Sequence, residues 1–108
     1  GRILDALDRL GLAEDTLVLY TTDHGDMCGA HGMIDKHFIL YDDVVRVPMI
    51  ARWPGRVPAG RVCEAFNRHV VDLASTFLDL AGVPIPETFQ GQSLVQRRRA
   101  QFIIPGLR

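Results

Sequence analysis

Apolar residues recur at helical spacing in two stretches of the chain. The first covers residues 2–10, and its apolar face consists of Ile3, Leu4, Leu7 and Leu10. The second follows Asp72, a residue suited to an N-cap, and its expected buried face consists of Leu73, Phe77, Leu80 and Ala81. Each stretch is followed by a glycine, Gly11 or Gly82, in the position where helices commonly end. The pattern therefore predicts two amphipathic helices, and residues 38–45 are expected to form a third, short one.

Two further apolar runs read as strands. Residues 16–22 are apolar without alternation at their centre, which is typical of a parallel strand covered on both faces. Residues 48–51 form a second apolar run, and residues 62–66 are expected to form a short edge strand. The segment 52–60 holds two prolines and two glycines and is predicted to be a turn-rich connection. Together these elements predict an α/β fold with a partial doubly wound sheet, because so few strands do not complete such a sheet.

Composition and charge narrow the function classes. The chain has 108 residues, of which 47% are hydrophobic and 23% charged, as in globular domains. Its net charge of −1 gives no reason to expect nucleic acid or an anionic membrane as partner. No apolar run reaches the roughly 18 residues of a membrane span. Two cysteines, Cys28 and Cys63, are too few for a disulfide framework and are expected to be unpaired. Because the chain begins at Gly1 rather than at methionine, the sequence predicts no compartment.

Candidate metal ligands follow the first predicted strand. Asp23 and His24 come directly after it, and ligands in open α/β sheets bind at the carboxyl ends of strands. Gly25 would allow the backbone bend that brings a carboxylate and an imidazole to one ion. The alternative is that Asp23 caps the following turn and that His24 is an ordinary loop residue.

A candidate anion site lies further along the same loop. Lys36 carries a positive charge suited to the non-bridging oxygens of a sulfate or phosphate ester. His31 and His37 are candidate donors to an ester or leaving-group oxygen. The alternatives are a surface lysine and two loop histidines without a role.

Several motifs in residues 3–94 resemble the sulfatase family of the alkaline-phosphatase-like superfamily. They are Thr21-Thr22-Asp23-His24-Gly25-Asp26, Gly29-Ala30-His31-Gly32-Met33, Lys36, Tyr41-Asp42, Arg46-Val47-Pro48, Trp53-Pro54-Gly55, the run from Val71 to Val83, and Gly91-Gln92-Ser93-Leu94. Their order and spacing match the carboxyl-side half of that family's catalytic domain. Residues 1–94 are therefore expected to be that part of the domain, and residues 95–108 are an unassigned tail.

The resemblance implies a doubly wound fold with a divalent cation, usually Ca²⁺, with Mn²⁺ or Mg²⁺ as alternatives. Asp23 and His24 match two of the family's metal ligands, and Lys36 matches the lysine that contacts the sulfate and the nucleophile. That nucleophile is a formylglycine made from a Cys/Ser-x-Pro-x-Arg motif, which this chain lacks. The amino-side pair of aspartate ligands is also absent, so the isolated chain is expected to be inactive.

The resemblance implies that the parent protein hydrolyses sulfate esters of aryl or carbohydrate substrates. One alternative is a phosphonate monoester hydrolase or phosphodiesterase of the same superfamily, in which Asp-His-Gly recurs. Another is a non-catalytic remnant that carries part of the site without its chemistry.

Overall fold

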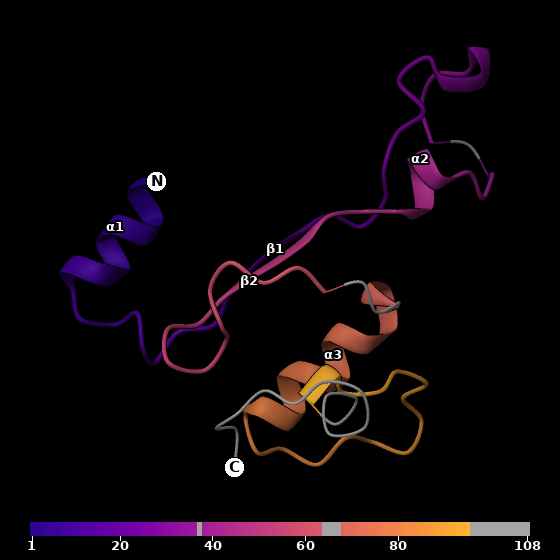
Figure 1. Cartoon of the computed structure of the whole chain (residues 1–108). Helices are drawn as coiled ribbons and strands as arrows, with labels where there is room; N and C mark the ends of the chain where they lie inside the picture. The colour runs from indigo at the N-terminus through magenta and orange to yellow at the C-terminus, as the bar shows by residue number, and fades with distance from the viewer. Residues whose placement is uncertain (37, 64–67, 96–108) are drawn as a thin grey trace. The chain divides into compact units, whose positions relative to one another are not determined.

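The computed structural model of the chain describes residues 1–36, 38–63 and 68–95. It divides into two compact units, Gly1–Ala59 and Gly60–Arg108 (Figure 1). The first unit contains the amino-terminal helix, a pair of strands and the long connection between those strands, which carries two short helical segments. The second unit contains the longest helix and the segment that follows it. Within the described ranges, every helix is too short or too polar to cross a membrane.

Helix α1 spans Arg2–Arg9 and confirms the first predicted helix. The helix is followed by Gly11 with a φ of 69°, a left-handed conformation that glycine adopts without steric cost. The helix is tied to the rest of its unit by an ion pair, in which the Arg52 guanidinium donates to the Asp8 carboxylate at 2.5 Å. The predicted helix is therefore correct.

Strands β1 (Val18–Thr21) and β2 (Met49–Arg52) form a two-stranded sheet. Both strands were predicted, and they run antiparallel with Thr21 opposite Met49, a pairing direction that the sequence pattern did not predict. A parallel neighbour needs a crossover that returns the chain to the other end of the sheet. Residues 22–48 instead bring the chain back to the end at which β1 stops, so β2 starts there.

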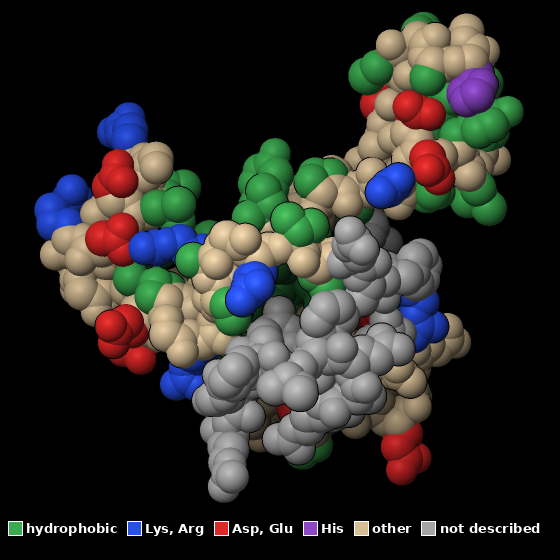
Figure 2. All heavy atoms as spheres, viewed as in Figure 1, with side chains coloured by type: hydrophobic (Ala, Val, Ile, Leu, Met, Phe, Trp, Pro, Cys, Tyr) green, Lys and Arg blue, Asp and Glu red, His purple; other side chains and the backbone are tan. Residues whose placement is uncertain are grey.

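The apolar run of the first strand suits cover on both faces, but that cover is incomplete in this chain. Tyr20 and Ile50 pair across the two strands, and they are 64% and 61% exposed. Figure 2 shows hydrophobic side chains at the surface of this unit. One face of the strand pair therefore lacks apolar cover within the described residues.

The connection between β1 and β2 carries two short helical segments. A 3₁₀ turn, η1, spans Ala30–Gly32, and helix α2 spans Asp42–Val45. Helix α2 confirms the short helix expected within residues 38–45, although it occupies only the second half of that range. The rest of the described connection is loop, as predicted.

A small apolar core anchors this connection. Met27 and Val44 are the buried hydrophobic residues among those the structure describes, at 1% and 7% exposure. The Gly25 N–H donates to the Val44 carbonyl at 2.8 Å, and the Met27 N–H donates to the Asp35 carbonyl at 3.1 Å. The start of the loop is therefore held against α2 by backbone hydrogen bonds.

The segment after β2 is built from turns, as predicted. Gly55 and Gly60 have φ values of 74° and 68°, and the Trp53 indole N–H donates to the Glu14 carbonyl at 2.6 Å. Val62 and Cys63 form no strand, so the predicted edge strand is wrong for these two residues. Its remaining residues, 64–66, lie outside the described residues.

Helix α3 spans His69–Leu80, and its N-cap, Arg68, lies four residues before the predicted N-cap. Asp72 is therefore not the N-cap but a first-turn residue, and its carboxylate accepts the backbone N–H of Arg68 at 2.9 Å. An acidic side chain that reaches back to the first N–H caps the helix from inside, much as in a capping box. The helix ends before Gly82, whose φ is 69°, as predicted.

The buried face of α3 differs from the predicted one. Phe77 is 47% exposed, whereas Asp72 and Ser75 are fully buried within this unit. The cause is the segment that follows the helix. The Ser75 hydroxyl donates to the Gly91 carbonyl at 2.9 Å, and the Gln92 N–H donates to the Asp72 carboxylate at 2.9 Å. Polar residues are buried because this segment supplies a hydrogen-bond partner for each of them.

Candidate metal and anion site

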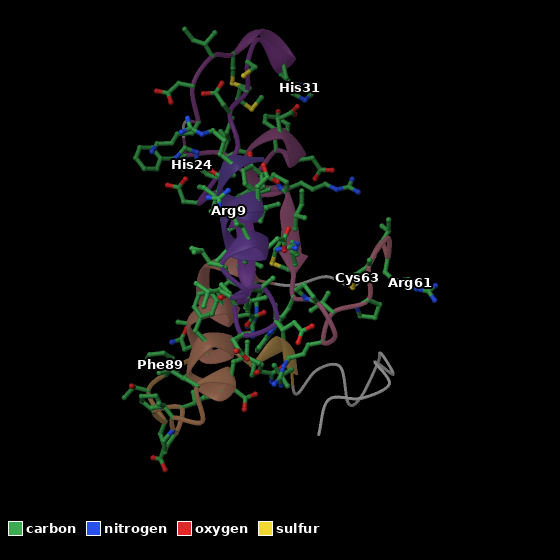
Figure 3. All side chains as sticks on the ribbon, turned by 90° about the vertical axis from the view of Figure 1, so that its left-hand side faces the viewer. Arg9, His24, His31, Arg61, Cys63 and Phe89 are labelled. Carbon is green, nitrogen blue, oxygen red and sulfur yellow. The ribbon has the colours of Figure 1, made fainter. Side chains whose placement is uncertain are left out.

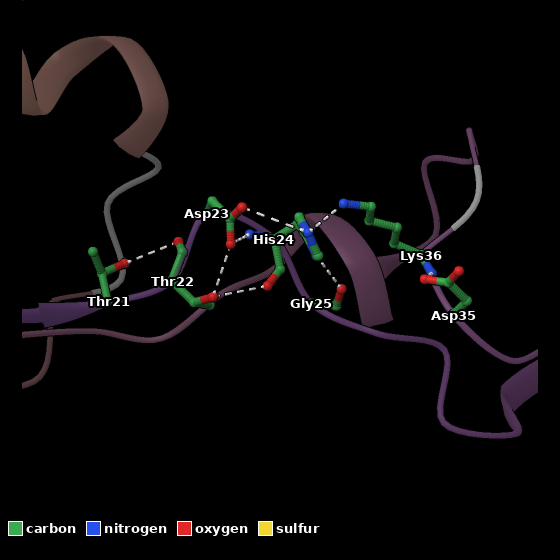
Figure 4. A network of polar contacts seen from close by, with 7 residues as sticks. All are labelled: Thr21, Thr22, Asp23, His24, Gly25, Asp35 and Lys36. Carbon is green, nitrogen blue, oxygen red and sulfur yellow. Dashed lines mark hydrogen bonds and ion pairs between the residues drawn. The ribbon is translucent and has the colours of Figure 1, made fainter.

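The end of β1 presents a compact network of polar side chains (Figure 4). The Thr22 hydroxyl lies 3.2 Å from an Asp23 carboxylate oxygen and 3.1 Å from the His24 carbonyl, both acceptors. The same Asp23 oxygen accepts the His24 backbone N–H at 3.1 Å. On the strand side, the Thr21 hydroxyl donates to the Pro48 carbonyl at 2.8 Å. The chain turn after β1 therefore fixes the position of the Asp23 carboxylate from two sides.

These contacts act on the charge of Asp23. The pKa of its carboxyl is lowered from the usual value of 3.8, first by a hydrogen bond from its own backbone N–H and next by the electrostatic interaction with the neighbouring His24. Hydrogen bonds to the charged form favour that form. Asp23 is exposed, so it is an ionised, accessible oxygen donor at neutral pH.

The ring of His24 is held on both sides. Its Nδ1 lies 2.7 Å from the Gly25 carbonyl oxygen, and its Nε2 lies 3.0 Å from Lys36 Nζ. A carbonyl oxygen only accepts and an ammonium group only donates, so the proton belongs on Nδ1 and the lone pair on Nε2. In this tautomer the Nε2 lone pair accepts from Lys36 Nζ, and a cation would bind there in place of that hydrogen bond.

Asp23 and His24 together fit part of a divalent cation site. An Asp23 oxygen lies 3.5 Å from His24 Nε2, which is less than the sum of two typical bonds of about 2.0–2.6 Å to one cation. Among the described residues, however, no group of three or more histidine, cysteine, aspartate or glutamate side chains is placed to hold a metal. The two residues can therefore supply two donors, and the remaining ligands must come from elsewhere.

Lys36 reaches this site from the far side of the loop. Its backbone N–H donates to the Asp35 carboxylate at 2.6 Å, and its side chain extends to His24. Asp35 has a φ of 68°, a left-handed conformation that aspartate tolerates better than most residues. The structure thus joins three of the predicted site residues, Asp23, His24 and Lys36, through direct contacts.

The two other predicted residues are not joined to this network. His31 stacks on Tyr41, with ring centroids 4.2 Å apart and ring planes 16° from parallel. Figure 3 shows His31 and His24 at separate places along the loop. His37 lies outside the described residues. A donor role of His31 or His37 toward an ester oxygen stays a prediction.

Both cysteines are free and exposed, as expected (Cys63 is labelled in Figure 3). The Cys28 backbone N–H donates to an Asp26 carboxylate oxygen at 2.7 Å. The pKa of the Cys28 thiol is raised above its usual value of 9.0 by a hydrogen bond to Asp26 and by the charge of that residue. A raised pKa keeps the thiol protonated, so Cys28 is poorly suited to act as a nucleophile.

Two contributors to the site were missed by the sequence reasoning. Thr22 was quoted only as part of a motif, although its hydroxyl contacts Asp23. Gly25 was assigned a flexible bend, but its carbonyl is the partner of His24 Nδ1. A hydroxyl residue directly before an Asp-His pair is the signal that would have identified Thr22. A backbone carbonyl carries no sequence signal.

Comparisons with known proteins identify relatives over most of the chain. Residues 29–101, more than half of the sequence, match the family model described as N-sulphoglucosamine sulphohydrolase, C-terminal. An N-acetylglucosamine-6-O-sulfatase of Bacteroides thetaiotaomicron is 43% identical over 94 residues, which is 87% of this chain and 16% of that protein.

Solved structures of similar proteins match most or all of the chain as well. A protein in complex with its substrate D-glucosamine-2-N,6-O-disulfate superposes with a TM-score of 0.79 and 42% identity, covering 87% of this chain and 19% of that one. The phosphonate monoester hydrolase of Agrobacterium radiobacter superposes with a TM-score of 0.80 and 34% identity, covering 100% of this chain and 20% of that one.

These likenesses confirm the predicted fold class, because the structural neighbours have the alkaline-phosphatase-like α/β fold. The chain spans about a fifth or less of the length of the relatives it matches. The members of the family are metalloenzymes, which agrees with the donor pair at the end of β1. The family model and the sulfatase relatives together show that this chain belongs to the sulfatase family.

Proposed function

We propose that this chain forms the carboxyl-side part of a sulfatase active site, with residues 1–94 belonging to the catalytic domain. The observation that carries the proposal is the contact of Lys36 Nζ with His24 Nε2 at 3.0 Å, next to the Asp23 carboxylate. It brings a fixed positive charge and two metal donors to one place at the end of a strand. That combination suits the binding of a doubly charged cation and an anionic ester side by side.

In this proposal each residue has a separate role. Asp23 and His24 donate to the cation, and the Thr22 hydroxyl orients the Asp23 carboxylate. Lys36 faces the non-bridging oxygens of the ester and stabilises their negative charge, most of all in the transition state. When bound, the cation would polarise the sulfate oxygens as a Lewis acid. The nucleophile comes from outside this chain, since the sequence lacks the Cys/Ser-x-Pro-x-Arg motif.

We assign the cation as Ca²⁺. The family resemblance supports this choice, whereas an imidazole donor is more usual with zinc or manganese. An exposed carboxylate with a lowered pKa is a donor suited to a hard cation. Mn²⁺ and Mg²⁺ are the alternatives that elemental analysis would distinguish.

The substrate class is a sulfate ester of a carbohydrate, and we propose a glucosamine sulfate. Support comes from two relatives, one named for N-acetylglucosamine-6-O-sulfate and one solved with D-glucosamine-2-N,6-O-disulfate. Aryl sulfates are the simpler esters to use as a general assay for the same bond cleavage.

The metal assignment is tested by Asp23→Ala in the full-length sulfatase that contains this chain. We expect elemental analysis to show loss of the bound cation and an assay to show loss of most of the activity, because one of the two local donors is removed. Asp15→Ala is the matched control, since Asp15 is an exposed aspartate of the same unit outside the site. Full metal occupancy and normal turnover in Asp23→Ala would refute the assignment.

The reaction class is tested by comparing substrates with the same protein. Glucosamine 6-sulfate and an aryl sulfate should be hydrolysed faster than a phosphonate monoester. The phosphonate hydrolase structure supports the competing assignment, and preferential cleavage of the phosphonate would favour it. Hydrolysis of none of these esters by a metal-loaded protein would favour the non-catalytic alternative.

A further inference from the structure

Gly25 links His24 to helix α2 through both of its backbone polar groups. Its carbonyl oxygen lies 2.7 Å from His24 Nδ1, and its N–H donates to the Val44 carbonyl at 2.8 Å. We propose that Gly25 is a positioning residue, which holds His24 in the tautomer with its proton on Nδ1 and its lone pair on Nε2, where a cation would replace Lys36 Nζ as the partner. This inference rests on the proposed metal-binding role of His24.

The tautomer follows from two contacts on opposite sides of the ring. The Gly25 carbonyl can only accept, so the Nδ1 beside it must donate. Lys36 Nζ can only donate, so the Nε2 beside it must accept. Both contacts therefore require the same form of the neutral ring. A metal-bound histidine usually donates its other ring N–H to a carboxylate or a backbone carbonyl, which fixes the ring orientation.

The position of the Gly25 carbonyl depends on its close approach to α2. A Cβ at residue 25 would lie 1.9 Å from the Asp43 carbonyl oxygen and 3.2 Å from the Val44 Cα. Both neighbours are backbone atoms, so a side chain at residue 25 cannot be accommodated by rotating another side chain. Residue 25 must therefore be glycine, because only glycine leaves room for the backbone of α2. The contact with α2 in turn fixes the position of the Gly25 carbonyl that accepts from His24.

The first experiment needs no substitution. The full-length sulfatase would be prepared free of metal with ¹⁵N-labelled histidine, and the ring nitrogens of His24 would be assigned by NMR at a pH where the ring is neutral. We expect the pyridine-type resonance at Nε2 and the pyrrole-type resonance at Nδ1. A ring with its proton on Nε2, or an unresolved mixture of the two forms, would overturn the inference.

The second experiment compares two glycine substitutions. Gly25→Ala should shift the tautomer balance and weaken cation binding by about 10–100-fold, which is the usual effect of removing such a partner. Gly91→Ala is the matched control, because its Cβ would also lie 1.9 Å from a backbone carbonyl oxygen, that of Val71 in the other unit. Gly91→Ala should lower the Tm of the protein while leaving the tautomer of His24 and the cation affinity unchanged.

The outcomes separate the inference from the proposed function. Equal loss of cation affinity in both variants, or an unchanged tautomer in a folded Gly25→Ala protein, would overturn the positioning role. If Gly25→Ala does not fold, the tautomer of the unsubstituted protein decides. A protein with the Nδ1–H tautomer at His24 that binds no Ca²⁺, Mn²⁺ or Mg²⁺ would refute the proposed metal site but not the orientation of the ring.

Discussion

Lys36 Nζ and His24 Nε2 lie 3.0 Å apart, so the residue proposed to face the ester and a proposed metal ligand share one hydrogen bond. Lys36 is also the only lysine in the sequence. The two residues are twelve positions apart, and the loop returns to bring them together (Figure 4). This contact makes cation binding and ester binding neighbouring functions of one loop.

Replacing Lys36 by alanine should affect turnover more than metal binding. Removing one group that stabilises developing charge typically lowers the rate by about 10²–10³-fold. Cation affinity should be kept or increased, because a positive charge next to His24 is lost. The measurement is kcat with a sulfate ester, together with titration of the metal-free protein with Ca²⁺. Arg56→Ala is the control, since Arg56 lies over the Trp53 ring rather than at the site. An unchanged kcat in Lys36→Ala would show that Lys36 is a surface lysine without a role in the reaction.

The Asp26–Cys28 contact predicts the reactivity of the thiol. Asp26 raises the pKa of Cys28, so Asp26→Asn should lower that pKa toward 9.0 and speed alkylation of Cys28 by iodoacetamide near pH 8. The rate at Cys63, which mass spectrometry follows in the same sample, should not change. An equal alkylation rate at Cys28 in the unsubstituted protein and in Asp26→Asn would show that Asp26 does not raise the pKa of the thiol.

The contact between Asp26 and Cys28 also predicts how the stability of the folded chain depends on pH. The pKa of Asp26 is lowered below 3.8, first by the hydrogen bond to the Cys28 side chain. Its ionised form is therefore favoured in the folded chain, so this contribution to stability is present above the unfolded pKa and is lost as pH falls through the lowered one. Acid unfolding curves of the full-length protein and of its Asp26→Asn variant should differ near neutral pH and converge in acid. Curves that keep the same separation at every pH would contradict this prediction.

Asp72 predicts a large loss of stability in the second unit. Its buried carboxylate accepts the N–H groups of Arg68 and Gln92 at 2.9 Å each. Hydrogen bonds to a charged group contribute about 1.5–3 kcal/mol each, so Asp72→Ala should cost roughly 3 kcal/mol or more. Denaturant unfolding of the full-length protein measures this change.

Asp79→Ala on the same helix is the control for Asp72. One carboxylate oxygen of Asp79 is buried without a hydrogen-bond partner among the described residues, so its removal should cost much less. Similar losses of stability in the two variants would show that the contacts of Asp72 are not what stabilises this unit.

The sequence predicted the helices and strands where local patterns determine them. Helical spacing and a final glycine located α1, and the apolar run located β1. The motifs also indicated Asp23, His24 and Lys36, which the structure brings into contact. The predictions of helices and strands succeed because periodicity and helix ends are visible in the sequence itself, whereas the roles of Asp23, His24 and Lys36 stay predictions.

The failures concern features that depend on contacts between distant residues. The direction in which β2 pairs with β1 depends on the path of the connecting loop. The polar buried face of α3 depends on Gly91 and Gln92, which supply the hydrogen bonds for Ser75 and Asp72. A helical pattern of apolar residues marks a face suited to burial, but it does not show which face the following segment covers.

The isolated chain should fold poorly and should not hydrolyse sulfate esters. Met27 and Val44 are the buried hydrophobic residues among those described, whereas Phe38 and Ile50 are largely exposed. So little buried apolar surface does not offset the conformational entropy lost on folding. Activity should be absent because the chain lacks the nucleophile motif and has only two of the proposed metal donors.

This prediction is tested by expressing residues 1–108 alone, recording a thermal melt, and assaying an aryl sulfate in the presence of Ca²⁺. We expect a broad transition without a cooperative midpoint, and sulfate release equal to that of a control without protein. A full-length sulfatase carrying the same residues is the positive control for the assay. A sharp melt from a monomer would show that the exposed face of the strand pair needs no further cover. Sulfate release above the control would show that these residues contain a complete catalytic site.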